Sequence, residues 1–321
     1  MTDVEEVDYH SRLKHEFIRI YLDFFRINVA ETARENGRSP PPLQIYDLYA
    51  AKGWCHCEEL ERLDQKNSIW KGSALIAADC IGEYPTSTRL FLNTFNPDSR
   101  KCGEQRAALE TNLLEFYGKY PTLKSKTTII SKPVEDAIDE GQYCLNRNYP
   151  NVWILDPYDA LPWTVIQKIT DLRGSYRDKK GNRVERKPEL IINLMSSILT
   201  RFSETNPENT TIALGMPEEE WMPLFHQYKY ELGNAREAIL KIYFERLKAL
   251  YGKEPVFTLV RDVTNRAIVY AMMLCSSNKT GYYLMHVKGL PTLAQFKVEV
   301  WQSYAKKIVR RRKDAGQQFL I

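Results

Sequence analysis

The sequence predicts an α/β protein in which helices cover both faces of a mostly parallel sheet. Between residues 43 and 194, short apolar runs alternate with stretches of helical spacing. Parallel neighbouring strands need crossover connections, which are usually helices, so this alternation favours a parallel sheet. Two later apolar runs, 256–261 and 267–276, flank a short polar stretch, which is typical of a hairpin. The sheet is therefore expected to close with an antiparallel pair.

The expected elements follow one another with short connections. Strands are expected at 43–50, 88–95, 127–130, 152–155 and 190–194, and helices at 10–34, from 72, and at 98–117, 134–146 and 162–172. Two more helices, 218–230 and 234–251, precede the hairpin, and a basic helix follows at 293–312. We therefore divide the chain into an N-terminal helix with its linker (1–42), an α/β domain (43–290) with a helical insertion at about 207–252, and a basic C-terminal helix (291–321).

The composition is that of an ordinary globular protein. Of 321 residues, 43% are hydrophobic and 27% are charged, and the net charge is +4. No apolar run approaches the roughly 18 residues that span a bilayer, and the N-terminus is acidic, so we expect a cytoplasmic protein with no membrane partner. The cysteines are scattered apart from Cys55 and Cys57, which favours reduced thiols and no metal site. No hydrolase elbow, phosphate-binding loop or metalloprotease helix is present.

The apolar run Val152-Trp153-Ile154-Leu155 ends abruptly in Asp156-Pro157-Tyr158. Such a run is typical of a buried parallel strand, and its carboxyl end would deliver an acid, a rigid backbone and an aromatic ring to one place. Open α/β sheets bind ligands in a crevice at that edge. The alternative is that Asp156 caps the helix beginning near residue 162 and that Tyr158 only packs.

A second motif follows the first strand. Asp47 ends the strand and is followed by a turn that contains Tyr49, Ala51 and Gly53. An acid followed by a tight turn of small residues is how nucleotide-like cofactors are held, because the turn lets the backbone approach the ligand.

These motifs, with Gly72-Ser73-Ala74-Leu75-Ile76-Ala77 and Pro162-Trp163, give the chain a resemblance to a known family. Their order resembles that of the three-Cys-motif partner proteins (TcmP family), within the class I S-adenosylmethionine-dependent methyltransferase fold, from about Lys14 to Val287. The resemblance implies a Rossmann-like, seven-stranded sheet, S-adenosylmethionine as cofactor and a three-Cys-motif protein as partner.

The resemblance also implies roles for individual residues. Asp156 would accept a hydrogen bond from the amine of a nucleic-acid base, the Pro157 carbonyl would assist, and Tyr158 would stack on the base. The cofactor would be bound by residues of the turn and of the end of the second strand: Asp47, Tyr49, Ala51, Gly53, Thr94 and Asn96.

The chain departs from the family pattern at three places. Ala51-Lys52-Gly53 stands where the family has Gly-Pro-Gly, and Thr94 stands where methyltransferases commonly have an acid that grips the ribose hydroxyls. Asp156-Pro157-Tyr158 also lacks one proline of the Asp-Pro-Pro-Tyr motif that it resembles in amino-methyltransferases acting on adenine. Alanine tolerates positive φ and close backbone contact less well than glycine. The departures bear mainly on cofactor binding.

Basic residues cluster between the fourth and fifth strands, which we expect to place them on the same rim as Asp156. They would bind the phosphates of DNA or RNA, the alternative being a solvated loop: Arg173, Arg177, Lys179, Lys180, Arg183, Arg186 and Lys187. A second basic run lies at 306–313, where an exposed helix face is the more common structure.

Two functions therefore stay open from the sequence. One is methyl transfer to a nucleic-acid base amine, in which the protein mainly positions the two reactants. The other is a catalytically inactive methyltransferase-like partner or nucleic-acid-binding protein, in a bacterial or phage module of the defence type; the altered turn favours it. A nucleotide-binding protein of another class is a third reading. The base, the partner and the oligomeric state are not readable from the sequence.

Overall fold

The computed structural model describes residues 3–62, 68–84, 88–177, 182–261 and 268–277. The predicted basic helix at 293–312 lies outside these residues, and so do Lys179 and Lys180. Among the described residues, no helix combines the length and the apolar character that a membrane span requires.

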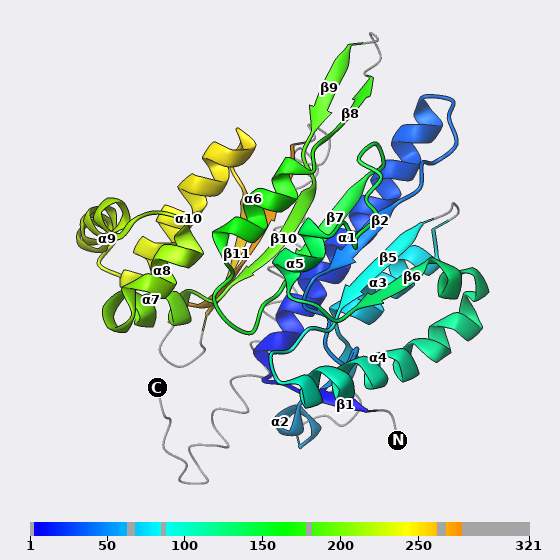
Figure 1. The fold of residues 1–321 in the computed structure, drawn as a ribbon, viewed down its shortest axis with the longest axis horizontal. Helices are drawn as coiled ribbons and strands as arrows, with labels where there is room; N and C mark the ends of the chain where they lie inside the picture. The colour runs from blue at the N-terminus through cyan, green and yellow to red at the C-terminus, as the bar shows by residue number, and fades with distance from the viewer. Residues whose placement is uncertain (1–2, 63–67, 85–87, 178–181, 262–267, 278–321) are drawn as a thin grey trace.

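The centre of the molecule is a seven-stranded sheet in the order β11-β12-β10-β7-β2-β5-β6 (Figure 1). Its strands, in chain order, are β2 (Gln44–Asp47), β5 (Arg89–Asn93), β6 (Thr127–Ile130), β7 (Asn151–Leu155), β10 (Glu189–Leu194), β11 (Val256–Arg261) and β12 (Ile268–Cys275). The strands from β10 to β6 are parallel, whereas β12 pairs antiparallel with both β10 and β11. The predicted mixed α/β fold with a central, mostly parallel sheet is confirmed.

Helices cover both faces of this sheet. One face packs on α1 (His10–Glu35), α3 (Ser73–Gly82) and α4 (Ser99–Lys119), and the other on α5 (Val134–Asp139), α6 (Trp163–Asp171), α8 (Pro207–Leu214), α9 (Glu218–Leu232) and α10 (Ala235–Tyr251). Alternate strand residues divide between the two cores: Val152 and Ile154 face the first, and Trp153 and Leu155 the second. Because both faces are buried, the central residues of these strands are mostly apolar.

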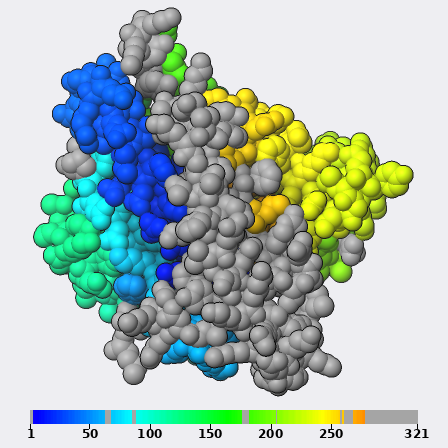
Figure 2. Space-filling model, turned by 180° about the vertical axis from the view of Figure 1, so that it is seen from behind, coloured from blue at the N-terminus to red at the C-terminus, as the bar shows by residue number. Residues whose placement is uncertain are grey.

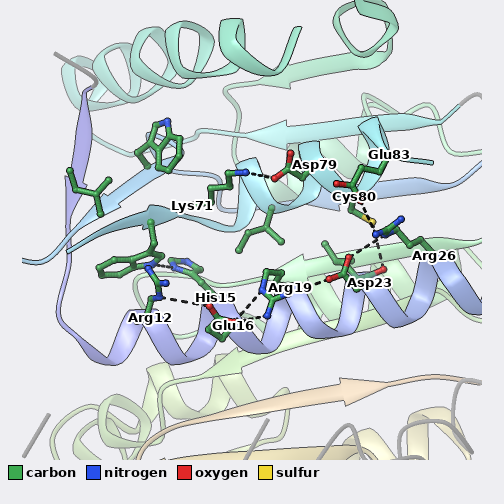
Figure 3. A pocket seen from close by; sticks show the side chains of 15 residues that line it. Arg12, His15, Glu16, Arg19, Asp23, Arg26, Lys71, Asp79, Cys80 and Glu83 are labelled. Carbon is green, nitrogen blue, oxygen red and sulfur yellow. Dashed lines mark hydrogen bonds and ion pairs between the residues drawn. The ribbon is translucent and has the colours of Figure 1, made fainter. Parts of the chain in front are cut away.

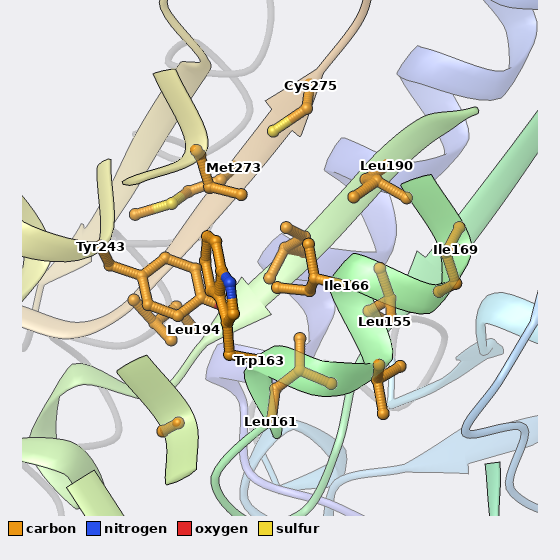
Figure 4. Packing of buried hydrophobic residues seen from close by; sticks show 14 of the residues in the cluster. Leu155, Leu161, Trp163, Ile166, Ile169, Leu190, Leu194, Tyr243, Met273 and Cys275 are labelled. Atoms are coloured by element: carbon orange, nitrogen blue, oxygen red, sulfur yellow. The ribbon is translucent and has the colours of Figure 1, made fainter. Parts of the chain in front are cut away.

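Trp163 joins the helical insertion to the sheet (Figure 4). Its ring meets Tyr243 of α10 edge to face, with the ring centroids 5.5 Å apart, and the Arg246 guanidinium lies 4.4 Å from its centroid. At Gly215, which ends α8 with a φ of +58°, a Cβ atom would come within 2.4 Å of the Trp163 ring. Only glycine satisfies both the backbone conformation and the space at this position. Seen from behind, α1 and the α9–α10 pair lie on opposite sides of the molecule (Figure 2).

Several elements were not expected from the sequence. A small sheet is formed by β1 (Val4–Glu6), β3 (Trp54–His56) and β4 (Ile69–Lys71), with the short helix α2 (Glu58–Glu61) beside it. Strands of three residues are too short to show a periodicity. The helix α7 (Ser196–Thr205) and the 3₁₀ helix η2 (Pro121–Lys126) were also missed. The helix expected at 134–146 stops at Asp139, because Gly141 has a φ of +67°.

The basic segment after the fourth strand of the sheet lies at the opposite edge from the one expected. It forms a hairpin of β8 (Gly174–Arg177) and β9 (Arg183–Arg186), which projects beyond the sheet at the top of Figure 1. The chain leaves β7 at the carboxyl edge, and α6 then carries it back to the amino edge before the hairpin begins. The expectation that these residues share a rim with Asp156 is therefore wrong.

Candidate functional site

The direction in which the chain adds strands to the sheet reverses between β2 and β7. The chain proceeds from β2 to β5 and β6 on one side, and then continues with β7 and β10 on the other. In open α/β sheets such a switch point leaves a crevice at the carboxyl ends of the two strands, and ligands bind there. Asp47 is the last residue of β2, and Asp156 directly follows β7. The two acids predicted from the sequence therefore flank the switch point.

Asp156 is held by groups from two other elements. The Lys14 ammonium of α1 lies 3.0 Å from its Oδ1 and 2.7 Å from its Oδ2, and Asn193 of β10 donates Nδ2–H to Oδ1 at 2.8 Å. Burial acts to raise the pKa of Asp156, but Lys14, His15 and these hydrogen bonds outweigh it and hold the pKa below its ordinary value. The side chain is a carboxylate at neutral pH and can only accept hydrogen bonds.

The structure does not show the helix cap that is the alternative for Asp156. The helix α6 begins at Trp163 after Pro162, and no side chain caps it. Tyr158 is not packed away either, since 60% of its surface is exposed, and its hydroxyl lies 3.5 Å from Glu5 Oε1. Pro157 between them is buried. A charged acceptor and an accessible aromatic ring thus lie two residues apart at the switch-point edge of the sheet, and we use the word crevice for this edge.

Asp47 is fully buried at the end of β2. Its Oδ1 accepts a hydrogen bond from the Tyr49 N–H at 3.3 Å, and its Oδ2 has no partner among the described residues. Burial raises the pKa of Asp47 to about 7, against the effect of hydrogen bonds from Ser73 and Tyr49. The Asn193 side chain likewise uses its Nδ2 on Asp156 and leaves Oδ1 without a donor in the described part of the chain. Two buried oxygens near Asp156, Asp47 Oδ2 and Asn193 Oδ1, thus have no hydrogen-bond donor among the described residues.

The other predicted cofactor residues make contacts of a different kind. Gly53 has a φ of +97°, and a Cβ atom there would lie 3.1 Å from the side chains of Leu75 and Leu109, so the residue faces the core. The buried Thr94 hydroxyl hydrogen-bonds with Ser131 Oγ at 2.9 Å. Asn96 Oδ1 accepts from the Asp98 N–H at 3.0 Å.

Two turn residues complete the predicted set. Tyr49 is half-buried against the core beneath α5 and α10, and Ala51 is half-buried in the turn. Of the six predicted residues, Asp47 alone presents a buried polar atom without a partner. The glycine turn and the ribose position do not fit S-adenosylmethionine, because their groups are directed to the core or engaged with neighbouring residues.

The N-terminal segment crosses the carboxyl edge of the sheet. We call residues 3–9 the N-terminal strap; they lie along the lower edge of the sheet in Figure 1. Asp3 pairs with Lys52 at 2.9 Å and its carbonyl accepts from Asn112 of α4, Glu6 meets His56 at 2.6 Å, and Tyr9 is buried. The strap is therefore anchored to the turn after β2, to β3 and to α4.

A cavity of about 450 Å³ lies between α1, α3 and β4 (Figure 3). Its charged lining forms a ladder of ion pairs: Arg12 with Glu16, Arg19 with Glu16 and Asp23, Arg26 with Asp23 and Glu83, and Lys71 with Asp79. The charges of the ladder balance one another, so this lining favours the docking of α1 on α3 over the binding of a charged ligand.

The basic residues of the hairpin are only partly accessible to a ligand. Arg173 pairs with Asp171 and Glu185, Arg183 donates to Ser175 Oγ at 3.1 Å, and the Lys187 ammonium donates to the Leu250 carbonyl. Arg177 and Arg186 are the last residues of β8 and β9. No group of three or more histidines, cysteines, aspartates or glutamates suited to a metal occurs in the described ranges.

Sequence reasoning missed three residues of the crevice: Lys14, Asn193 and Glu5. Asn193 had a visible signal, since it is a polar residue inside the apolar run 190–194. Lys14 and Glu5 had none, because nothing local distinguishes them from other charged residues near the N-terminus.

Comparisons with known proteins add little to this geometry. No protein-family model and no curated protein matches the chain. Among solved structures, it is similar to protein LPL1258 from Legionella pneumophila, of the family DUF519, at 10% identity over 92% of each chain with a TM-score of 0.46. It is also similar to cofactor-bound Rv0187 from MTB, at 9% identity over 80% of each chain with a TM-score of 0.37.

Proposed function

We propose that the protein recognises the amino group of a nucleobase at Asp156-Pro157-Tyr158. The observation that carries the proposal is the state of Asp156, a carboxylate that directly follows β7 at the switch point and already accepts N–H groups from Lys14 and Asn193. A carboxylate has about four acceptor sites. These contacts use three of them, so one remains for the ligand amine. The exposed Tyr158 ring then offers a surface on which the base can stack.

Of the two activities that the resemblance to the TcmP family implies, we retain the binding of a base at Asp156-Pro157-Tyr158. The binding of a cofactor is treated separately. The contacts of Gly53 and Thr94 do not fit S-adenosylmethionine, so no step is routed through it. Methyl transfer is the second candidate function. It is favoured by one observation, the unpartnered Asp47 Oδ2 at the end of β2.

The test compares nucleotides that differ in their amino groups. Calorimetric titration with the 5′-monophosphates of adenosine, cytidine and guanosine, which carry an exocyclic amine, is run beside uridine and inosine monophosphates, which do not. We expect the amine-bearing nucleotides to bind about tenfold more tightly, because an unpaired acceptor or donor costs about 1–3 kcal/mol. Tyr158→Ala should weaken binding of all of them, since stacking is insensitive to the base.

The control is Tyr230→Ala, which alters a ring that is 91% exposed on α9, away from the crevice, and should change nothing. Equal affinity for all five nucleotides would overturn the proposal. A separate titration with S-adenosylmethionine decides the second candidate, because binding that Asp47→Asn abolishes would support methyl transfer.

A further inference from the structure

The N-terminal strap brings a second acid to the crevice. Glu5 is the middle residue of β1, which pairs in parallel with β3, Glu5 lying opposite Cys55 and Glu6 opposite His56. Successive side chains of a strand point to opposite sides. Glu6 accordingly meets His56, whereas Glu5 meets the Tyr158 hydroxyl. The pairing register therefore decides which of the two acids enters the crevice.

Both Glu5 oxygens are acceptors at this position. Oε1 lies 3.5 Å from the Tyr158 hydroxyl, and Oε2 is buried with no donor in the described part of the chain. A buried acceptor without a donor costs free energy, so it needs a reason. Burial raises the pKa of Glu5, and the charge of Lys52, whose ammonium pairs with Asp3 at 2.9 Å, opposes this only in part.

Burial raises the pKa of the Tyr158 hydroxyl, and the charges of Glu5 and Asp156 raise it further. A ring that stacks on Tyr158 would thus meet two acidic side chains, one from β7 and one from the strap. The carboxylates of Glu5 and Asp156 would both face the edge of the stacked base, and two such acceptors match a base that presents two adjacent donors. Guanine does so through its amine and ring N–H, whereas adenine and cytosine place a ring acceptor beside the amine.

We infer that Glu5 is a specificity-determining residue, which makes the crevice selective for a base with two adjacent donors, the guanine type. This inference rests on the proposed recognition of a base amine at Asp156. The strap is then part of the binding site, and its anchors at Asp3 and Glu6 hold Glu5 in place.

The experiment uses Glu5→Gln in the full chain, because glutamine keeps the shape and replaces one acceptor with a donor. Guanosine monophosphate should bind the unaltered protein about tenfold more tightly than adenosine monophosphate. In Glu5→Gln its affinity should fall by about tenfold, while adenosine monophosphate stays within about twofold or improves. Glu115→Gln, the same change at an exposed acid of α4 outside the strap, is the matched control and should leave the selectivity unchanged.

Hydrogen exchange of the Val7 amide, which donates to the His56 carbonyl, reports whether the strap stays docked in each variant. Equal binding of the two nucleotides, or equal weakening of both in Glu5→Gln with the strap docked, would refute the role of Glu5 and leave amine recognition intact. If nucleotides with and without an exocyclic amine bound the unaltered protein equally well, the proposed function itself would be refuted.

Discussion

At the residue scale, the site depends on an ion pair between side chains 142 positions apart in the sequence, Lys14 and Asp156. The Lys14 side chain is 18% exposed and that of Asp156 is 9% exposed, so water compensates little for the loss of either partner. Removing one member of a largely buried pair leaves the other charge uncompensated, which costs more than the pair contributes.

Lys14→Met should therefore lower the free energy of unfolding by about 3 kcal/mol, because the Asp156 carboxylate loses its counter-charge. Adding Asp156→Asn should recover most of that loss, since the amide is neutral and still accepts from Asn193. Urea denaturation of the two single variants and the double variant measures the coupling. Additive effects would show that the pair does not act as a unit.

A second buried acid, Glu189, lies at the amino end of β10, away from the crevice. Its carboxyl group accepts hydrogen bonds from the Tyr21 hydroxyl and, at 3.1 Å, from Ser276 Oγ. Burial raises the pKa of Glu189 to about 8, against the effect of Ser276. The folded protein therefore keeps a proton that the unfolded chain releases near pH 4.5.

Because the folded state binds the extra proton, this group's contribution to stability is complete below about pH 4.5 and is lost as the pH rises to about 8. The free energy of unfolding should fall relative to that of Glu189→Gln across this range, by up to about 1.4 kcal/mol per pH unit. Denaturant titrations of both proteins at several pH values test this. Parallel pH profiles would contradict a buried, protonated Glu189.

At the element scale, the strands that form the site are also the ones that the sequence indicates most clearly. The strands β2, β7 and β10 are buried along their whole length, so their apolar runs are visible without any neighbour. The β8–β9 hairpin differs from these strands. Its basic composition can be recognised in the sequence, but the edge of the central sheet at which it lies cannot. Its position depends on α6 returning the chain across the sheet.

The hairpin should consequently act independently of the crevice. Arg173→Ala with Arg183→Ala should leave nucleotide binding at Asp156 unchanged, because the two lie at opposite edges of the sheet. If the hairpin binds phosphates, the same change should weaken binding of a longer single strand and reduce its salt dependence. Titrations at several salt concentrations separate the two effects. Weaker mononucleotide binding in this variant would contradict the placement.

At the scale of the whole molecule, one sheet separates two apolar cores, and the helical insertion belongs to the second. Trp163 is 2% exposed and contacts the insertion at Tyr243, Arg246 and Gly215. The insertion is therefore part of the core beneath α6.

Trp163→Ala should lower the free energy of unfolding by about 4 kcal/mol, because it leaves a large cavity between α6 and α10. Tyr230→Ala, which removes a ring that is 91% exposed, should stay within about 0.5 kcal/mol of the unaltered protein. Chemical denaturation monitored by far-ultraviolet circular dichroism compares the two. A small effect at Trp163 would mean that the insertion is not integrated into the core.

The sequence by itself determined the alternation of strands and helices and the positions of Asp47 and Asp156 at strand ends. These properties are local: a fully apolar run, the residue that interrupts it and the spacing of a helix face can be recognised within a few residues. The same local information predicted the closing hairpin.

The tertiary structure alone decided which groups meet in the crevice. Lys14, Asn193 and Glu5 reach it from α1, β10 and the strap, and no local pattern marks such long-range contacts. It also turned Gly53 toward the core and engaged Thr94 with Ser131, although both occupy the positions that the motif predicts. A motif determines where a residue lies along the chain, whereas packing determines which way its side chain faces and whether its hydrogen-bonding groups stay available to a ligand.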